Sequence, residues 1–228
     1  SRKARSGCLG RIFGFVLFLI VAAVGVIAAV KYMPSRERAD LDALYAAGGS
    51  DRVALYLNYE RQEESGVYVD GQTYLPAAWV DANLNERFYW DANEEILVYT
   101  LPEEIVKSDE TTVDEDGKKI LYRDGDAVYL SLALIQKYTD VRLQAYDGEA
   151  QKRVFVENNW DPVTVADAAW SAKIRLRGGL KSPIVTEIKR GGTVTVLEQY
   201  DNWARVMTPD GHIGYMHKWK MKNLHEET

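Results

Sequence analysis

The chain has 228 residues, 46% of them hydrophobic, and carries 28 Lys and Arg against 34 Asp and Glu, for a formal net charge of −6. This is the composition of a folded protein, and its acidic balance does not suit nucleic acid, whose phosphates need clustered cations. With a single cysteine, Cys8, no disulfide can form within the chain, so each domain must be held together by apolar packing.

An apolar run over residues 12–30 follows a basic N-terminus. A helix of nineteen residues spans roughly 28 Å, close to the ~30 Å hydrocarbon core of a bilayer. The basic residues before the run are Arg2, Lys3, Arg5 and Arg11. Because no acid precedes Glu37, the positive-inside rule predicts a cytoplasmic tail over 1–11 and a transmembrane anchor over 12–33, with the rest outside the cell membrane. The alternative is a cleaved secretory signal, which would deliver the same domains outside.

Residues 34–50 form the predicted juxtamembrane linker. Leu41, Leu44 and Tyr45 have the spacing of one helical face, and Gly48-Gly49 would stop that helix. We therefore expect a short helix followed by a hinge.

From Arg52 onward the apolar period changes to two, and Asp-Gly pairs follow that begin at residues 70, 116, 124, 147 and 210. Asp-Gly between alternating segments is a strong hairpin signal, because both turn positions need positive φ. The pattern predicts mostly antiparallel β-structure.

Two copies of one pattern lie within this region. In the first, Asp70-Gly71 leads to Tyr-Leu-Pro, an apolar segment, and the strand Ile-Leu-Val-Tyr that starts at residue 96. In the second, Asp124-Gly125 leads to Tyr-Leu-Ser, an apolar segment, and Val-Phe-Val from residue 154. Pro76 suits a first helical turn and Ser131 an N-cap, so each copy predicts hairpin, helix, hairpin.

The pattern DGQTYLPAAWVDANLNERFYWDANEEILVYT resembles the copper amine oxidase N-terminal-like domain of bacterial envelope proteins, over residues 51–160. The resemblance implies a twisted antiparallel sheet with packed helices that serves as a stalk. Copper needs imidazole or thiolate ligands, and residues 31–211 contain no His and no Cys, so we predict neither a metal nor another cofactor.

Residues 161–171, which follow Trp160, look like a linker, and residues 172–226 resemble a bacterial SH3 domain. The resemblance rests on the opening Ile-Arg-Leu-Arg from residue 174, on the Gly178–Pro183 loop, and on the positions Ile188, Gly191, Gly192, Val194, Val196, Trp203, Val206, Asp210, Gly211, Gly214 and Tyr215. It implies a small β-barrel that binds peptidoglycan. Two positions depart from the family: Tyr215 stands where Trp is more usual, and Arg-Gly-Gly replaces the common arginine-small-glycine-proline loop. These departures leave the predicted fold unchanged but bear on which ligand the domain binds.

These features predict a mainly β protein with short helices: an α+β stalk domain of two hairpin-helix-hairpin repeats, a small SH3-like β-barrel, and one N-terminal transmembrane helix. The order of modules resembles the front part of membrane-anchored family 18 glycoside hydrolases of Gram-positive bacteria. In those proteins a catalytic barrel follows the SH3 module.

No catalytic constellation occurs in the sequence. His212, His217 and His225 all lie in the last 17 residues, and no nucleophile motif, phosphate loop or Asp-x-x-Asp-x-Asp-x-Glu strand is present. The acidic residues of the 109–116 segment lack the alternation of a calcium loop and predict a solvated hairpin tip. The odd separation of His212 and His217 would point them to opposite faces of a strand, which argues against a shared metal. We therefore predict that the chain is not an enzyme.

The candidate ligand-binding residues are aromatic or cationic side chains of the last domain: Tyr200, Trp203, Tyr215, His217, Trp219, Arg175 and Arg177. Flat rings with polar tips can stack on sugar C–H faces or pack against a peptide stem. We expect Trp203 and Tyr215 to pack in the core, and Tyr200 and Trp219 to be exposed. The two arginines belong to a cationic patch with Lys181, Lys189 and Arg190, suited to wall carboxylates or phosphates.

The leading interpretation is a single-pass membrane protein whose SH3 module binds or positions the glycan or peptide of the cell wall. The alternatives are the non-catalytic front of a wall glycosidase and a structural spacer or protein–protein adaptor.

Overall fold

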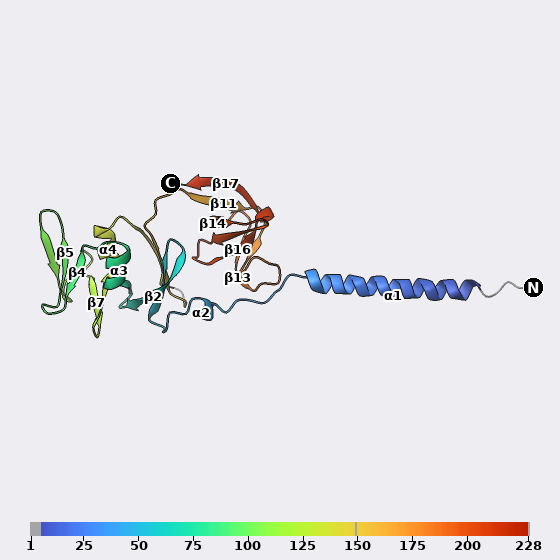
Figure 1. Cartoon of the computed structure of the whole chain (residues 1–228), viewed down its shortest axis with the longest axis horizontal. Helices are drawn as coiled ribbons and strands as arrows, with labels where there is room; N and C mark the ends of the chain where they lie inside the picture. The colour runs from blue at the N-terminus through green and yellow to red at the C-terminus, as the bar shows by residue number, and fades with distance from the viewer. Residues whose placement is uncertain (1–5, 149, 228) are drawn as a thin grey trace, which may run out of the picture.

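The computed structural model describes residues 6–148 and 150–227; Arg2, Lys3 and Arg5 of the predicted tail lie outside this part of the chain. A single long helix, α1 (Ser6–Tyr32), projects from two β-rich domains (Figure 1). Its segment Ile12–Tyr32 is apolar and long enough to cross a membrane, and none of it is buried against the rest of the protein. Length and composition fit either a membrane span or a signal sequence.

The repeat domain (residues 52–157) is built on a seven-stranded sheet in the order β7-β8-β3-β2-β1-β10-β9. Its strands are β1 (Arg52–Leu57), β2 (Glu60–Val69), β3 (Gln72–Pro76), β7 (Leu121–Asp124), β8 (Ala127–Ser131), β9 (Arg142–Tyr146) and β10 (Arg153–Glu157). Neighbours are antiparallel except β1 and β10, which pair in parallel.

The predicted duplication is visible in the sheet. Each copy is a hairpin, a helix and a second hairpin, with the helices at α3 (Ala77–Asn83) and α4 (Leu132–Tyr138). Strands β3 and β8 pair reciprocally: Leu75 lies opposite its equivalent Leu130, Tyr74 opposite Ser131, and Pro76 opposite Tyr129. Equivalent residues that exchange partners in this way define a local two-fold relationship between the copies.

The second hairpins of the two copies belong to different sheets. In the first copy, β4 (Phe88–Asp91) and β5 (Ile96–Thr100) join β6 (Ile105–Ser108) in a separate three-stranded sheet. In the second copy, β9 and β10 extend the main sheet beside β1. The helices also start differently, because the Ser131 hydroxyl accepts a hydrogen bond from the Leu134 amide at 3.2 Å, whereas Pro76 precedes α3 without a side-chain cap.

The C-terminal domain (residues 163–227) is a seven-stranded antiparallel sheet in the order β13-β12-β16-β15-β14-β11-β17. Its elements are β11 (Val163–Ala168), β12 (Ala172–Arg175), β13 (Ile184–Ile188), β14 (Thr193–Gln199), β15 (Trp203–Met207), β16 (Ile213–His217), the 3-10 turn Lys218–Lys220 and β17 (Met221–Glu227). The sheet folds over a core of small and branched side chains that includes Ile174, Val206 and Met216. It is not closed between β13 and β17, so the predicted barrel is an open sheet.

Residues 161–171 are not a linker, because β11 is an interior strand of the C-terminal sheet, between β14 and β17. In this strand Val163 and Val165 share one face, whereas Ala166 and Ala168 share the other face and belong to the core. This period of two was the sequence signal for a strand. The alanine-rich composition concealed it.

The segment after α1, predicted as a juxtamembrane linker over residues 34–50, makes hydrogen bonds with the C-terminal domain. Residues 35–39 run along the open edge of β13, where the Ile184 amide donates to the Glu37 carbonyl and the Ile184 carbonyl accepts from the Ala39 amide, both at 2.8 Å. One helical turn follows, α2 (Leu41–Leu44), and then Tyr45, which is buried beside Phe155 of the repeat domain and Met207 of the C-terminal domain. The segment therefore packs against both domains.

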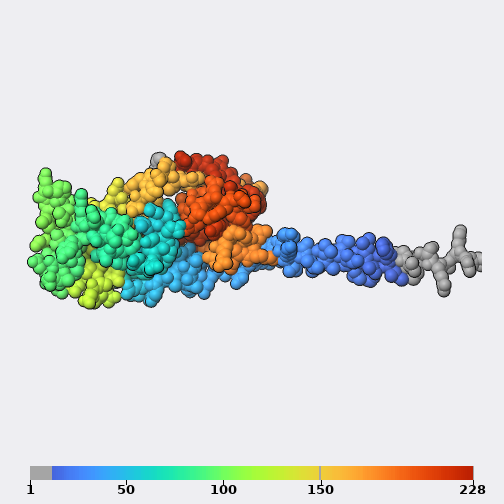
Figure 2. All heavy atoms as spheres, viewed as in Figure 1, coloured from blue at the N-terminus to red at the C-terminus, as the bar shows by residue number. Residues whose placement is uncertain are grey.

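Because this segment packs on the C-terminal domain directly after α1, it sets the order of the helix and the two domains along the long axis of the molecule. The C-terminal domain lies next to the end of α1, and the repeat domain lies beyond it (Figures 1 and 2). The repeat domain therefore does not separate the helix from the C-terminal domain, as a stalk would.

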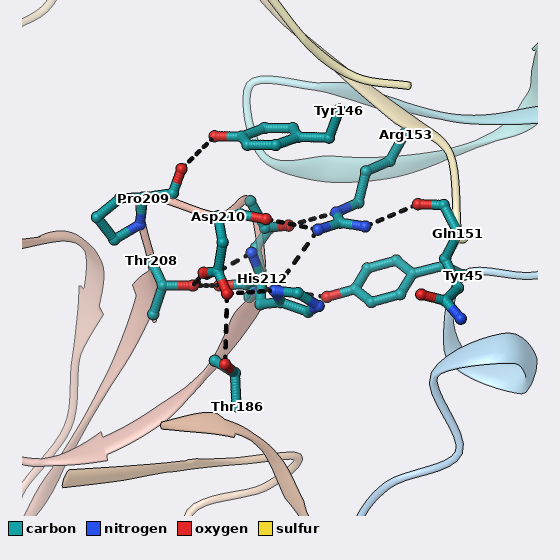
Figure 3. Close-up of polar contacts among 11 residues, drawn as sticks. Tyr45, Tyr146, Gln151, Arg153, Thr186, Thr208, Pro209, Asp210 and His212 are labelled. Carbon is teal, nitrogen blue, oxygen red and sulfur yellow. Dashed lines mark hydrogen bonds and ion pairs between the residues drawn. The ribbon is translucent and has the colours of Figure 1, made fainter. Parts of the chain in front are cut away.

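A buried arginine joins the two domains (Figure 3). Arg153 of β10 is fully buried, and its Nε donates to the Gly211 carbonyl at 2.7 Å while its Nη2 donates to the Asp210 carbonyl at 2.5 Å. The guanidinium lies between the rings of Tyr45 and Tyr146, at 4.8 and 5.2 Å from their centroids. Carbonyls and ring faces thus replace the water that this charge has lost.

Candidate ligand-binding surface

The aromatic side chains lie on the outer face of the C-terminal sheet, opposite its core. Along β15 and β16 the inward residues are Ala204, Val206 and Met216, and the alternate positions point outward. Trp203 and Tyr215 occupy these outward positions and are half-buried. The expectation that both pack in the core is therefore wrong, because the alternation sets them on the other face.

A groove of about 290 Å³ is lined by Arg177, Gly178, Tyr200, Trp203 and Tyr215. Its residues come from the β12–β13 connection, the β14–β15 turn and the strands β15 and β16, which the sheet order β12-β16-β15-β14 brings side by side. The ring centroids of Tyr200 and Tyr215 are 5.9 Å apart. The backbone of Gly178 lies against Trp203, since a Cβ there would be 3.2 Å from the indole Cγ. The groove is thus an aromatic floor with a cationic edge.

Tyr200 is 46% exposed at the turn between β14 and β15, as expected from the sequence. Its hydroxyl donates to Glu198, which also accepts from Arg205 Nη1 at 2.7 Å. The hydrogen bond to the Glu198 carboxylate raises the pKa of Tyr200 to about 12. The phenol therefore stays protonated near neutral pH, with its polar tip fixed and its ring face free to stack on a ligand.

Trp219 and His217 line a second hollow of about 410 Å³, which Trp203 separates from the groove. Trp219 is 61% exposed, as expected, on the 3-10 turn that follows β16. Burial and then the nearby Lys220 lower the pKa of His217, so its ring is neutral at pH 7. Its buried Nδ1 has no hydrogen-bond partner among the described residues.

The two candidate arginines have different surroundings. Arg177 is exposed and lines the groove. Arg175 is 3% exposed, and its guanidinium donates to the carbonyls of Ser182 at 2.5 Å and Ser35 at 3.2 Å. Arg175 thus fixes the segment after α1 through the Ser35 carbonyl and does not offer an exposed cation.

The histidines do not gather in one place. His212 precedes β16 and lies at the domain interface, with its ring 5.6 Å from that of Tyr45, whereas His217 is beside Trp203 at 4.9 Å. His225 is exposed on β17. Within residues 6–148 and 150–227, no three His, Cys, Asp or Glu side chains are grouped to hold a metal ion.

Two arginines that the sequence did not single out connect the surface to the repeat domain. Arg205, on the outer face of β15, donates to the Glu60 carboxylate at 2.5 Å and the Tyr59 carbonyl at 3.0 Å. Arg153 holds the turn before β16. A signal for Arg153 was present in the sequence, because it directly precedes the apolar run Val154-Phe155-Val156, which predicts a buried strand.

The repeat domain has a hollow of its own, of about 550 Å³, between β5, β6 and α4. Its floor includes Leu97, Ile120 and Leu134, and its rim is the acidic segment 114–116. Asp109 and Asp114 of that region accept hydrogen bonds from the amides of their own turns, the behaviour of loop carboxylates. Nothing in the hollow indicates a ligand class.

Comparison with protein families identifies the C-terminal domain. A search of curated proteins finds no match for the chain. The family model described as bacterial SH3 domain matches residues 170–222, which hold both the aromatic groove and the Trp219 turn. The C-terminal part of this chain is a bacterial SH3 domain.

Proposed function

We propose that this chain is a membrane-anchored extracytoplasmic protein whose C-terminal domain binds or positions peptidoglycan through the Tyr200–Trp203–Tyr215 groove. The observation that carries the proposal is this groove, because three rings share one outer face of a domain whose family is commonly involved in cell-wall binding. Arg177 at its edge supplies a cation for a carboxylate of a wall peptide.

The rest of the chain has a supporting role in this proposal. The apolar segment Ile12–Tyr32 is the anchor, with the basic residues before it on the cytoplasmic side. The repeat domain, which resembles the copper amine oxidase N-terminal-like domain, is a rigid neighbour that fixes the groove through Arg153 and Arg205. We assign no catalysis and no cofactor to these residues.

Cosedimentation of the whole detergent-solubilised protein with purified sacculi tests the proposal. We expect pelleting that Tyr200→Ala weakens about tenfold, the loss of one stacked ring with its polar tip. Tyr89→Ala is the matched control, because Tyr89 is 63% exposed on β4 of the repeat domain. Pelleting no greater than that of an unrelated acidic protein would exclude wall binding and leave the spacer or adaptor function.

A second candidate is the non-catalytic front of a family 18 glycoside hydrolase, which the order of modules favours. The coding sequence after Thr228 tests it: a barrel with an Asp-x-x-Asp-x-Asp-x-Glu strand supports this function, and an immediate stop codon excludes it.

A further inference from the structure

The end of the C-terminal domain that faces α1 carries an exposed apolar and cationic surface. It comprises the loop 178–182 and the 3-10 turn Lys218–Lys220, which border the hollow that Trp219 lines. Pro34, two residues after α1, lines the same hollow. We call this surface the membrane-proximal face.

Hydrogen bonds fix the height of this face relative to the helix. Lys181 Nζ donates to the Val30 carbonyl at 2.6 Å, and the Ser35 amide donates to the Leu180 carbonyl at 2.8 Å. Val30 lies in the last turn of α1, whose carbonyls have no partner within the helix, so the Lys181 ammonium also complements the negative end of the helix dipole. Figure 2 shows the orange residues of this loop against the blue end of α1.

That height corresponds to the boundary of a bilayer. The 21 residues of Ile12–Tyr32 span roughly 31 Å as a helix, the thickness of the hydrocarbon core. Val30 then lies just inside the outer boundary of the core, and a loop that contacts its carbonyl lies among the lipid headgroups.

The side chains on this face are those that suit headgroups. Leu180 is 44% exposed and Trp219 61% exposed, with the Lys220 ammonium 5.3 Å from the Trp219 ring. The segments 172–181 and 216–222 contain Lys and Arg but no Asp or Glu, in a chain with an acidic net charge. A carboxylate also lines the hollow, Glu187, and it is paired with Arg38 at 3.4 Å.

We propose that the membrane-proximal face docks on an anionic phospholipid surface, with Leu180 and Trp219 at the level of the headgroups and Lys181 and Lys220 beside the phosphates. The proposal rests on α1 being a membrane anchor, which is part of the proposed function. Docking gives the C-terminal domain a second attachment beside α1. The domain is then held in one orientation, with the Tyr200–Trp203–Tyr215 groove adjoining the docked face through Gly178 and Trp203.

Spin-label accessibility in lipid nanodiscs tests the docking on the whole chain. Gly179→Cys places a unique label in the loop when Cys8, the only cysteine, is changed to Ser, and a Cβ at Gly179 meets no atom within 4 Å. We expect the label to be shielded from a water-soluble relaxant, about threefold more in anionic than in zwitterionic nanodiscs. A label at Tyr89→Cys, on β4, should be accessible in both.

Two variants separate docking from its alternatives. Leu180→Asp combined with Trp219→Ala should expose the label at residue 179. The matched control, Leu224→Asp with Trp160→Ala, changes side chains that are 47% and 53% exposed elsewhere and should leave the label shielded. A label equally accessible in both nanodiscs would overturn the proposal, as would shielding by soluble wall fragments without lipid. A chain that alkaline carbonate releases from the bilayer would instead refute the anchor.

Discussion

Arg153 donates a 2.7 Å hydrogen bond from Nε to the carbonyl of Gly211, a residue of the other domain, so the acceptor of this buried charge is a backbone carbonyl and not a carboxylate (Figure 3). The guanidinium is fully buried, and its further donors reach the carbonyls of Asp210 and Gln151. A buried charge is tolerated only when its donors are satisfied, so the relative position of the two domains is tied to this side chain.

Arg153→Met should destabilise the protein by about 2–4 kcal/mol, because it leaves the carbonyls of the 210–211 turn without their buried donors. The free energy of unfolding of Arg153→Lys should lie between those of wild type and Arg153→Met, because an ammonium keeps the positive charge but lacks the planar set of donors of a guanidinium. Urea unfolding measures the loss, and hydrogen exchange should show faster opening of residues 208–213. Arg87→Met, at an exposed position, is the control. Wild-type stability of both Arg153 variants would mean that the hydrogen bonds of Arg153 to the 210–211 turn contribute nothing to the free energy of unfolding.

Gly211→Ala should be more harmful than the same change at another left-handed glycine. Gly211 has φ of +72°, and a Cβ there would lie 2.5 Å from Cε2 of Tyr146. Gly125 has φ of +61° with nothing within 4 Å, so Gly125→Ala reports the backbone cost alone, about 1 kcal/mol. In a Tyr146→Ala background the ring is gone, so Gly211→Ala should cost less stability than it does in wild type. A double-mutant cycle without coupling between residues 146 and 211 would contradict the contact.

Acid should weaken the same turn. The hydrogen bond from His212 holds the pKa of Asp210 well below its usual range, with a further hydrogen bond from Thr208. A carboxyl with a depressed folded pKa stabilises the fold above its unfolded pKa of about 3.9, and this contribution is lost as the pH falls toward the folded value. Because the side chain is 52% exposed, solvent screening limits the effect to about 1 kcal/mol.

The measurement is the free energy of unfolding of wild type and Asp210→Asn between pH 7 and pH 2. Wild type should be the more stable at pH 7, and the two curves should converge as the pH falls below 4. Asp126→Asn, at an exposed position of the β7–β8 turn, should give no such difference. A gap that is constant over the whole pH range would rule out the carboxylate as its source.

Arg175 should protect the segment after α1 from proteolysis. Arg175→Met removes the donor to the Ser35 carbonyl, so residues 35–39 should leave the edge of β13 more often. Loss of hydrogen bonds worth about 1.4 kcal/mol would increase the open population roughly tenfold. Limited trypsin digestion at Arg36 and Arg38 reports that opening. Arg177→Met, at the exposed neighbour, should digest at the wild-type rate, and unchanged cleavage of Arg175→Met would refute the role.

Much of the architecture was predictable because its determinants are local. The nineteen-residue apolar run specified α1, and the Asp-Gly pairs placed the β2–β3 and β7–β8 turns. The helix N-cap at Ser131 needs only residues within one turn of it. Among the site residues, the exposure of Tyr200 at its hairpin turn was predictable for the same reason.

The errors arose where contacts are long-range. Alternation along β15 was visible in the sequence, but which face of the sheet is covered was not, so Trp203 and Tyr215 were assigned to the wrong side. The alanine-rich composition around β11 resembled a linker, whereas its pairing with β14 and β17 makes it an interior strand. The role of Arg175 depends on Ser35, which is 140 residues away in the chain.

The sequence by itself determined the elements of this protein: an apolar helix, a duplicated hairpin-helix-hairpin unit and a C-terminal SH3 domain, because propensity and periodicity act over a few residues. Only the tertiary structure decided that the C-terminal domain lies beside α1, that Arg153 fixes it to the repeat domain, and that its aromatic rings share one outer face. Those relationships come from hydrogen bonds and close packing between distant segments, for which short-range patterns carry no signal.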